Sequence, residues 1–240
     1  MFSIFSFNKN ILDAGMLSGM TDVHSHLLPG VDDGMGSAEE SYQACRYLEK
    51  MGVKRIFLTP HIMEDLPDNH PSFLKQRFDT FVENNPSGIE FRMAGEYMMD
   101  NGFDGQLKEG MLTVGDNYVL VETSYMAASP DVPRMLYELS VRGYCPLIAH
   151  PERYLYMPLE QLLALKDRKY AFQMNLMSLA GIYGKDVQKR ALFLLREGHY
   201  TFVGSDIHKL SVYQRALSAL SLSKDDRKAL GILLENNRNL

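Results

Sequence analysis

Nine side chains of the kinds that bind metal ions recur along this 240-residue chain, most of them close to the end of a predicted strand. They are five histidines and four carboxylates: His24, His26, Asp33, His61, Glu96, Glu122, His150, Asp206 and His208. Imidazole and carboxylate groups suit Mn²⁺, iron and Zn²⁺, and the oxygen-rich set favours Mn²⁺. At the C-terminal ends of successive strands of a β/α barrel, such groups meet in one place. The sequence therefore predicts a polynuclear metal site and a metal-dependent hydrolase.

Two of the motifs place ligands at alternate positions. His24 and His26 follow a short apolar stretch that ends at Val23. In an extended segment, alternate residues point the same way, so both imidazoles can face one ion. Asp206 and His208 repeat this spacing after a predicted strand at 201–204. An aspartate there can orient an attacking water, so Asp206 and His208 are also candidate catalytic residues.

Single positions have structural interpretations as well. Asp33 lies beside Asp32 in a loop, and aspartates are common in turns. Glu122 closes an apolar strand, where a carboxylate either meets a cation or simply reaches solvent. His70 and His199 do not follow strands, and we expect them to be surface or loop residues.

Arg153 follows His150 by three residues and is the candidate catalytic and substrate-binding arginine. Its planar, permanently charged guanidinium group fits phosphate oxygens. The neighbouring Glu152 could instead hold Arg153 in a structural salt bridge, and both interpretations stay open. Neither Cys45 nor Cys145 has an arginine at the spacing that a cysteine-based tyrosine phosphatase requires, so both are predicted to be packing residues.

The elements that must position these residues alternate along the chain. Besides the stretch that ends at Val23, strands are predicted at 54–59, 89–95, 117–121, 146–149, 170–174 and 201–204. Helices are predicted at 37–51, 72–84, 131–142, 159–167, 187–198, 210–221 and 224–236. A β-α alternation implies a parallel sheet in the α/β class. About seven strands favour a closed or distorted barrel, with a doubly wound open sheet as the alternative.

The composition makes several classes of protein less probable, among them nucleic-acid-binding, disulfide-rich and integral membrane proteins. Lys and Arg number 25 against 30 Asp and Glu, a net charge of −5 that argues against nucleic-acid binding without excluding it. Two cysteines give no disulfide framework and indicate a reducing cytoplasm. No apolar run is long enough for an integral membrane segment. We expect residues 1–20 to be an N-terminal extension packed on a domain at 21–240, with a weak membrane or partner contact of its apolar start as the alternative.

Taken together, the motifs resemble those of the polymerase-and-histidinol-phosphatase (PHP) superfamily. The matching segments are His24-Ser25-His26, Asp33 nine residues after His24, Thr59-Pro60-His61, Gly95-Glu96, Glu122, His150-Pro151-Glu152-Arg153-Tyr154 and Ser205-Asp206-Ile207-His208. Within the superfamily, the chain is similar to the bacterial manganese-dependent protein-tyrosine phosphatases of capsule and exopolysaccharide operons. The resemblance covers about residues 21–236 and leaves the extension unmatched.

The resemblance implies a distorted, TIM-like (β/α)₇ barrel with two or three metal ions, Mn²⁺ first and iron or Zn²⁺ as alternatives. It implies that Arg153 is the family's arginine. The implied substrate is the phosphotyrosine tail of a bacterial tyrosine kinase that controls capsular or exopolysaccharide synthesis, in the cytoplasm near the inner membrane. Such ions would activate a water for in-line attack on phosphorus, while Arg153 neutralises charge on the phosphate oxygens.

Two other functions stay open at this stage. Another phosphoester hydrolase of the same barrel would act on histidinol phosphate, nucleotides or nucleic acid. A catalytically idle module would only dock the kinase.

Overall fold

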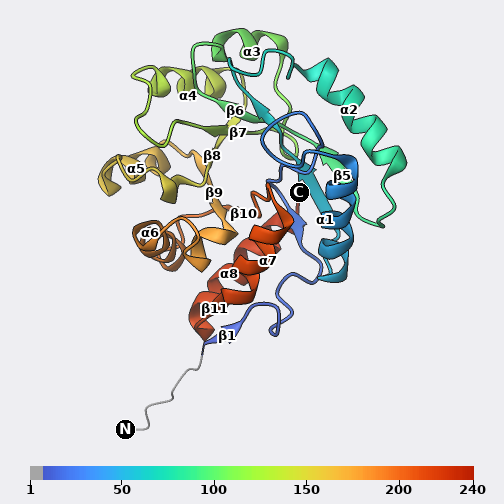
Figure 1. Cartoon of the computed structure of the whole chain (residues 1–240). Coiled ribbons are helices and arrows are strands. Elements are labelled where there is room, and N and C mark those ends of the chain that lie inside the picture. Colours follow the sequence, from blue (N-terminus) through green and yellow to red (C-terminus); the bar gives the residue numbers. More distant parts are fainter. Residues whose placement is uncertain (1–7) are drawn as a thin grey trace.

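A curled sheet of parallel strands forms the centre of the molecule, with helices around its outer side (Figure 1). The structure is a computed structural model that describes residues 8–240. The apolar run at 1–7, for which a membrane or partner contact is the alternative, lies outside the described residues. None of the described helices is long and apolar enough to cross a membrane.

The strands divide into a larger and a smaller parallel sheet. The larger has the order β10-β9-β8-β7-β6-β4, with β4 (His61–Ile62), β6 (Glu96–Met98), β7 (Tyr118–Glu122), β8 (Cys145–Ala149), β9 (Ala171–Asn175) and β10 (Phe202–Gly204). The smaller has the order β2-β3-β5, with β2 (Thr21–Asp22), β3 (Arg55–Leu58) and β5 (Glu90–Met93). Spatial order follows chain order, without the reversal that defines a doubly wound sheet.

The two sheets meet at both edges. On one side, β3 leads into β4 and β5 leads into β6, with the backbone N–H of Ala94 donating to the Leu58 carbonyl at 2.9 Å. On the other side, a parallel bridge pairs Ser25 with Ile207. The sheet therefore curls back toward its own first strand. The count of seven β/α units stays a prediction.

Two predicted strands are confirmed, and each is followed by a short strand that was not predicted. The prediction at 54–59 is β3, after which β4 begins at His61, and the prediction at 89–95 is β5, after which β6 begins at Glu96. Proline has no N–H to donate, so Pro60 interrupts the first ladder. Gly95 sits in the second break, where an added Cβ would stand 2.6 Å from Ile62 Cδ1. The ladder is thus interrupted between β3 and β4 and again between β5 and β6.

The seven predicted helices are confirmed, with ends shifted by up to two residues. They are α1 (Ala38–Lys50), α2 (Pro71–Asn84), α4 (Val132–Val141), α5 (Leu159–Asp167), α6 (Lys185–Arg196), α7 (Leu210–Ala219) and α8 (Lys224–Arg238). Ser37 caps α1 by accepting from the Glu40 N–H at 3.3 Å. The structure adds α3 (Phe103–Glu109), which the sequence pattern did not predict, and two short 3₁₀ helices, η1 (Pro151–Arg153) and η2 (Leu176–Ala180).

Residues 8–20 pack on the C-terminal part of the chain. β1 (Lys9–Asn10) pairs antiparallel with β11 (Ser221–Leu222), as Figure 1 shows beside the red helices. Ile11, Leu17 and Met20 are buried in the main core. A domain boundary after residue 20 stays a prediction.

The strands are apolar on both faces, as expected for a parallel sheet that is covered on both sides. In β7, Val119 and Val121 belong to the main apolar cluster, while Leu120 belongs to a second, smaller cluster. Because alternate residues share a face, Glu122 follows Leu120 on the same face. That face thus changes from apolar to charged at the C-terminal end of the strand.

Asn237 of α8 bridges β2 and β10, which have no ladder between them. Its fully buried amide donates to the carbonyls of Thr21 at 2.7 Å and Val203 at 2.6 Å, and accepts from the Val203 N–H at 3.1 Å. Buried backbone groups need partners. One side chain therefore supplies the pairing that is missing between two strands.

Replacing Asn237 by Ala should lower the free energy of unfolding by about 2–4 kcal/mol, because three buried backbone groups lose their partner. Asn239→Ala, at an exposed position of the same helix end, is the control and should change it by less than about 0.5 kcal/mol. Chemical denaturation of both variants measures the difference. Equal stabilities would contradict this role for Asn237.

Candidate metal centre

All nine side chains singled out in the sequence lie together at the C-terminal ends of the parallel strands. They form three overlapping groups in which the ligand atoms lie within 4.8 Å of one another. The groups are His26, Asp33, His61 and His208; His24, Glu96, His150 and Asp206; and His61, Glu96 and Glu122. His70 and His199 lie outside these groups, and exposed His70 caps α2.

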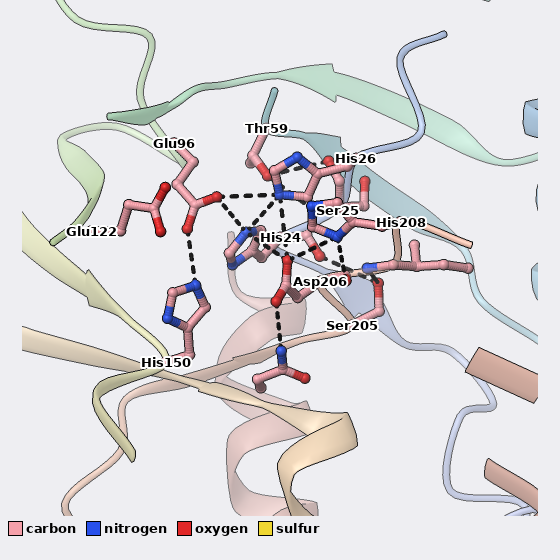
Figure 2. Close-up of polar contacts among 12 residues, drawn as sticks. His24, Ser25, His26, Thr59, Glu96, Glu122, His150, Ser205, Asp206 and His208 are labelled. Carbon is pink, nitrogen blue, oxygen red and sulfur yellow. Dashed lines mark hydrogen bonds and ion pairs between the residues drawn. The ribbon is translucent and has the colours of Figure 1, made fainter. Parts of the chain in front are cut away.

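Glu96 contacts histidines from several segments of the chain (Figure 2). Its Oε2 atom lies 3.1 Å from His24 Nε2, 3.2 Å from His26 Nε2 and 3.2 Å from His61 Nδ1. Its Oε1 atom lies 3.1 Å from His150 Nε2. Two atoms that share one ion at about 2.1 Å stand roughly 3 Å apart when they bind at right angles. The observed distances have this size.

Three candidate ligands lie at strand ends as predicted. His61 follows β3 and Glu96 follows β5; each is also the first residue of a short further strand, β4 and β6, and the two are paired in register. Glu122 ends β7, and its Oε1 atom lies 3.0 Å from His61 Nδ1.

Backbone strain accompanies two of the ligands. His150 and Asp206 have φ angles of 33° and 50°, and Lys169 is the remaining non-glycine residue with positive φ in residues 8–240. Such conformations are rare for residues with a side chain and persist only where surrounding contacts hold them. Gly204, two residues before Asp206, allows the backbone to approach His24 closely, because a Cβ at this position would stand 2.5 Å from His24 Cβ.

Asp32 and Asp33 have different roles. Asp33 is largely exposed, and its Oδ1 atom lies 3.4 Å from His61 Nε2 and 3.3 Å from His208 Nε2. Asp32 Oδ2 lies 2.8 Å from His26 Nδ1 and accepts from the His61 N–H at 3.1 Å. Asp32 also accepts from the Gly34 N–H at 3.0 Å, so it is a turn residue that orients a histidine as well.

Two amides of β9 support the groups, and the sequence analysis missed both. Gln173 Oε1 lies 2.9 Å from His24 Nδ1, and Asn175 Nδ2 donates to Asp206 Oδ2 at 2.6 Å. They stand at alternate positions of a fully buried strand. Polar residues at this spacing near the end of an apolar strand are a signal that could have been used.

Arg153 donates to Asp206 Oδ2 at 3.1 Å and not to Glu152. Glu152 is buried and accepts from the Asn175 N–H at 3.0 Å, from Ser178 Oγ at 2.7 Å and from the Tyr200 hydroxyl at 2.9 Å. A salt bridge between Arg153 and Glu152 is therefore wrong as an interpretation. The arginine belongs to the site instead.

The groups open into a pocket of about 700 Å³. Its charged lining comprises Asp33, His61, Asp65, Glu122, Arg153, Asp206, His208 and Lys209. Its apolar lining comprises Met63, Leu66, Met98, Met177, Ile182 and Val212, and the rings of Tyr125 and Tyr183 also border it. The pocket thus places an apolar surface beside charged groups.

Because the carboxylates of the site are buried, they stay ionised only where positively charged groups lie beside them. Burial alone would raise the pKa of Glu96, but nearby His24, His61 and His150 hold that pKa well below its usual range. Burial and His26 both lower the pKa of His61, yet Glu96, Asp33 and Glu122 raise it to about 10. The carboxylates are therefore stable as anions only beside a cation, either a protonated imidazole or a metal ion.

Unpaired atoms mark where a cation fits. Among the described residues, Glu96 Oε2 and His61 Nδ1 are buried without a well-oriented hydrogen bond, although they lie 3.2 Å apart. Buried polar atoms without partners are costly and rare in proteins. A shared metal ion would satisfy both, so the donor set fits metal binding.

Comparison with known proteins identifies the family. The model of the family described as "Capsular polysaccharide synthesis, CpsB/CapC" matches residues 20–236. The chain belongs to the CpsB/CapC family. It is 29% identical to the tyrosine-protein phosphatase YwqE of Bacillus subtilis (strain 168), over 92% of this chain and 91% of the relative. It is 27% identical to the tyrosine-protein phosphatase CpsB of Streptococcus pneumoniae, over 92% and 98%.

Solved structures agree with this membership. The chain matches a crystal structure from work on YwqE of Bacillus subtilis and CpsB of Streptococcus pneumoniae, described as unique metal-dependent tyrosine phosphatases. The TM-score is 0.74 at 28% identity, over 90% of this chain and 95% of that one. A phosphotriesterase homology protein from Escherichia coli, at 15% identity and a TM-score of 0.57, shares the fold alone. The family recognised from the motifs is confirmed.

Replacing Glu96 by Gln should reduce the metal content of this CpsB/CapC protein, because Glu96 belongs to two of the three groups. Glu152→Gln is the matched control, since Glu152 is equally buried but belongs to none of them. Metal per folded molecule, measured by inductively coupled plasma mass spectrometry, should fall only for Glu96→Gln. Full metal content in that variant would exclude Glu96 as a ligand.

Proposed function

We propose that this chain is a metal-dependent protein-tyrosine phosphatase. The observation that carries the proposal is the gathering of nine potential ligands and Arg153 around one pocket, in a chain whose CpsB/CapC relatives are named tyrosine-protein phosphatases. The apolar lining supports an aryl phosphate as the substrate, because a phenyl ring can pack there while its phosphate meets the charged groups.

The nine residues are proposed to hold two or three ions, with Mn²⁺ preferred and iron or Zn²⁺ as alternatives. Three overlapping groups of ligand atoms support this number. When bound, such ions lower the pKa of water toward about 7 and offset negative charge on phosphate oxygens. Asp32 and Gln173 would hold His26 and His24 in the tautomers and orientations that binding needs.

Asp206 connects the ligand groups to Arg153. Its Oδ1 atom lies 3.4 Å from the Nε2 atoms of His24 and His26, while its Oδ2 atom accepts from Arg153. Asp206 Oδ1, with His208 beside it, is proposed to orient the attacking water, whose proton passes to solvent. The N–H groups of Arg153 would bind the phosphate oxygens and stabilise the charge that builds up on them. Phenol has a pKa of about 10 and therefore leaves more readily than an alkoxide.

The fold is proposed to be a distorted (β/α)₇ barrel. Joining β3 with β4 and β5 with β6 gives two longer strands, and with β2 and β7 to β10 the total becomes seven. The Ser25–Ile207 bridge supports this count, because it links the last strand to the first.

The proposed physiological substrate is the phosphotyrosine tail of a bacterial tyrosine kinase that controls polysaccharide synthesis, in the cytoplasm near the inner membrane. The family's association with capsular polysaccharide synthesis supports this choice. The proposed substrate is tested against two alternatives. The chain could act on phosphoesters of small molecules, or it could dock the kinase without catalysis.

Metal-stripped protein should be inactive, and addition of individual ions should restore hydrolysis of a phosphotyrosine peptide, with Mn²⁺ the most effective. A phosphoserine peptide should react much more slowly, because its leaving group is poorer. Alkylation should leave activity intact, since burial raises the pKa of the Cys45 thiol to about 11 and no thiol belongs to the groups.

Three results would contradict the proposal. Activity that survives complete chelation would exclude the metal mechanism. Activity on small phosphomonoesters but not on phosphopeptides would favour another phosphoester hydrolase. A metal-replete protein without any phosphatase activity would favour a docking module.

Replacing Arg153 by Ala should lower kcat/KM by ~10²–10³-fold without loss of metal, because the transition state loses charge-assisted hydrogen bonds. Arg153→Lys should recover only part of this, since one ammonium group cannot make the two-pronged contact. Steady-state kinetics and metal analysis check both variants. An unchanged kcat/KM in Arg153→Ala would remove Arg153 from the active site.

A further inference from the structure

The guanidinium group of Arg153 lies between two tyrosine rings. Its central carbon stands 4.1 Å from the ring centroid of Tyr125 and 4.2 Å from that of Tyr183. Two rings centred this close over the same face would contact each other, and no ring contact joins Tyr125 to Tyr183 among the described residues. Each ring therefore lies against its own part of the guanidinium group, where it attracts the positive charge.

Both tyrosines also touch the surroundings of the metal centre through their hydroxyl groups. The Tyr125 hydroxyl donates to Glu122 Oε2 at 3.3 Å. The Tyr183 hydroxyl accepts from Asn175 Nδ2 at 3.1 Å, and the same amide donates to Asp206 Oδ2. Both rings therefore lie next to the candidate metal centre as well as to the arginine.

Arg153 keeps donors that the described protein does not use. A guanidinium group has five N–H bonds, and the one protein hydrogen bond found for Arg153 in the described chain goes to Asp206. Arg153 also lines the pocket. The edge of the group can therefore make a two-pronged contact with a phosphate that enters the pocket.

The location of Tyr125 argues against a role in packing alone. Its side chain is 42% exposed, in the loop between β7 and α4, and it belongs to neither apolar cluster of the core. Tyr183 comes from a different segment, between η2 and α6. Two distant segments thus each place a ring against the same arginine at the pocket.

We propose that Tyr125 and Tyr183 are positioning residues that hold the edge of Arg153 toward the substrate phosphate. This inference rests on the proposed function, because it assigns Arg153 to phosphate binding. The rings stop the long arginine side chain from sampling other orientations, and the Asp206 contact fixes the guanidinium group in its own plane. The substrate phosphate then meets donors that are already aligned.

The test is a set of double-mutant cycles on metal-replete protein. Tyr125 and Tyr183 are each changed to Phe and to Leu, in the wild-type and in the Arg153→Ala background. Tyr137→Leu is the control, because Tyr137 is 60% exposed on α4 and does not border the pocket. The readouts are the Kd of inorganic phosphate by calorimetry, kcat/KM for a phosphotyrosine peptide, metal content and Tm.

Each Leu variant should weaken phosphate binding and lower kcat/KM by about tenfold, the loss expected for one ring against a cation. Each Phe variant keeps the ring and should lose less than about threefold. Metal content and Tm should stay at wild-type values. In the Arg153→Ala background the Leu variants should cause no further loss, because the residue on which the rings act is gone. The Tyr137→Leu control should behave as wild type throughout.

The same tenfold loss in the Arg153→Ala background would overturn the proposal, since the rings would then act on the ligand directly. Phe variants as weak as the Leu variants would overturn it too, because the hydroxyls and not the ring faces would matter. The proposed function fails separately, if the wild-type protein hydrolyses no phosphotyrosine peptide. The phosphate-binding cycles still decide the positioning role in that case.

Discussion

The structure depends on one electrostatic constraint: buried carboxylates and imidazoles of the site need a cation between them. Glu96 shows this most directly, because one of its oxygens faces three histidine nitrogens at 3.1–3.2 Å and has no well-oriented hydrogen bond. Burying such groups without compensation is expensive. A metal ion offsets that cost, and the fold must bring side chains from seven segments to one point for this to happen.

The irregular features of the backbone serve this convergence. The ladder breaks at 59–60 and 94–95 leave His61 and Glu96 after β3 and β5, as the first residues of β4 and β6. Left-handed backbone at His150 and Asp206 turns two further ligands toward the centre. The strained positions are held by hydrogen bonds: Gln173 Oε1 accepts from the His150 N–H, and Asn175 Nδ2 donates to Asp206 Oδ2.

Much of this could be predicted from the sequence, because the pattern of apolar residues reports helices and regular strands. All seven predicted helices exist, and the alternate spacing in the segments 24–26 and 206–208 identified candidate ligands that do lie together. The short strands β4 and β6 could not be predicted in the same way, because two or three residues show no periodic pattern. Asp32 could not be recognised either, because an aspartate shortly before a glycine is common in ordinary turns.

Other parts of the site depend on tertiary structure alone. Tyr125 and Tyr183 lie 58 positions apart in loops without a motif, and only the folded chain shows that both meet Arg153. Glu152 was equally ambiguous, because sequence proximity suggested a salt bridge to Arg153 while the fold buries it against Ser178 and Tyr200. Local spacing therefore identified the candidate ligands more reliably than the residues that orient them.

The central claim is that the three groups hold metal ions. Anomalous diffraction from crystals of the manganese-loaded protein, measured on both sides of the manganese absorption edge, tests it directly. The account predicts two or three anomalous peaks within the groups, each about 2.0–2.4 Å from its ligand atoms, with one peak beside Glu96. Peaks only at exposed carboxylates outside the nine residues, or no peak in a crystal of active protein, would contradict it.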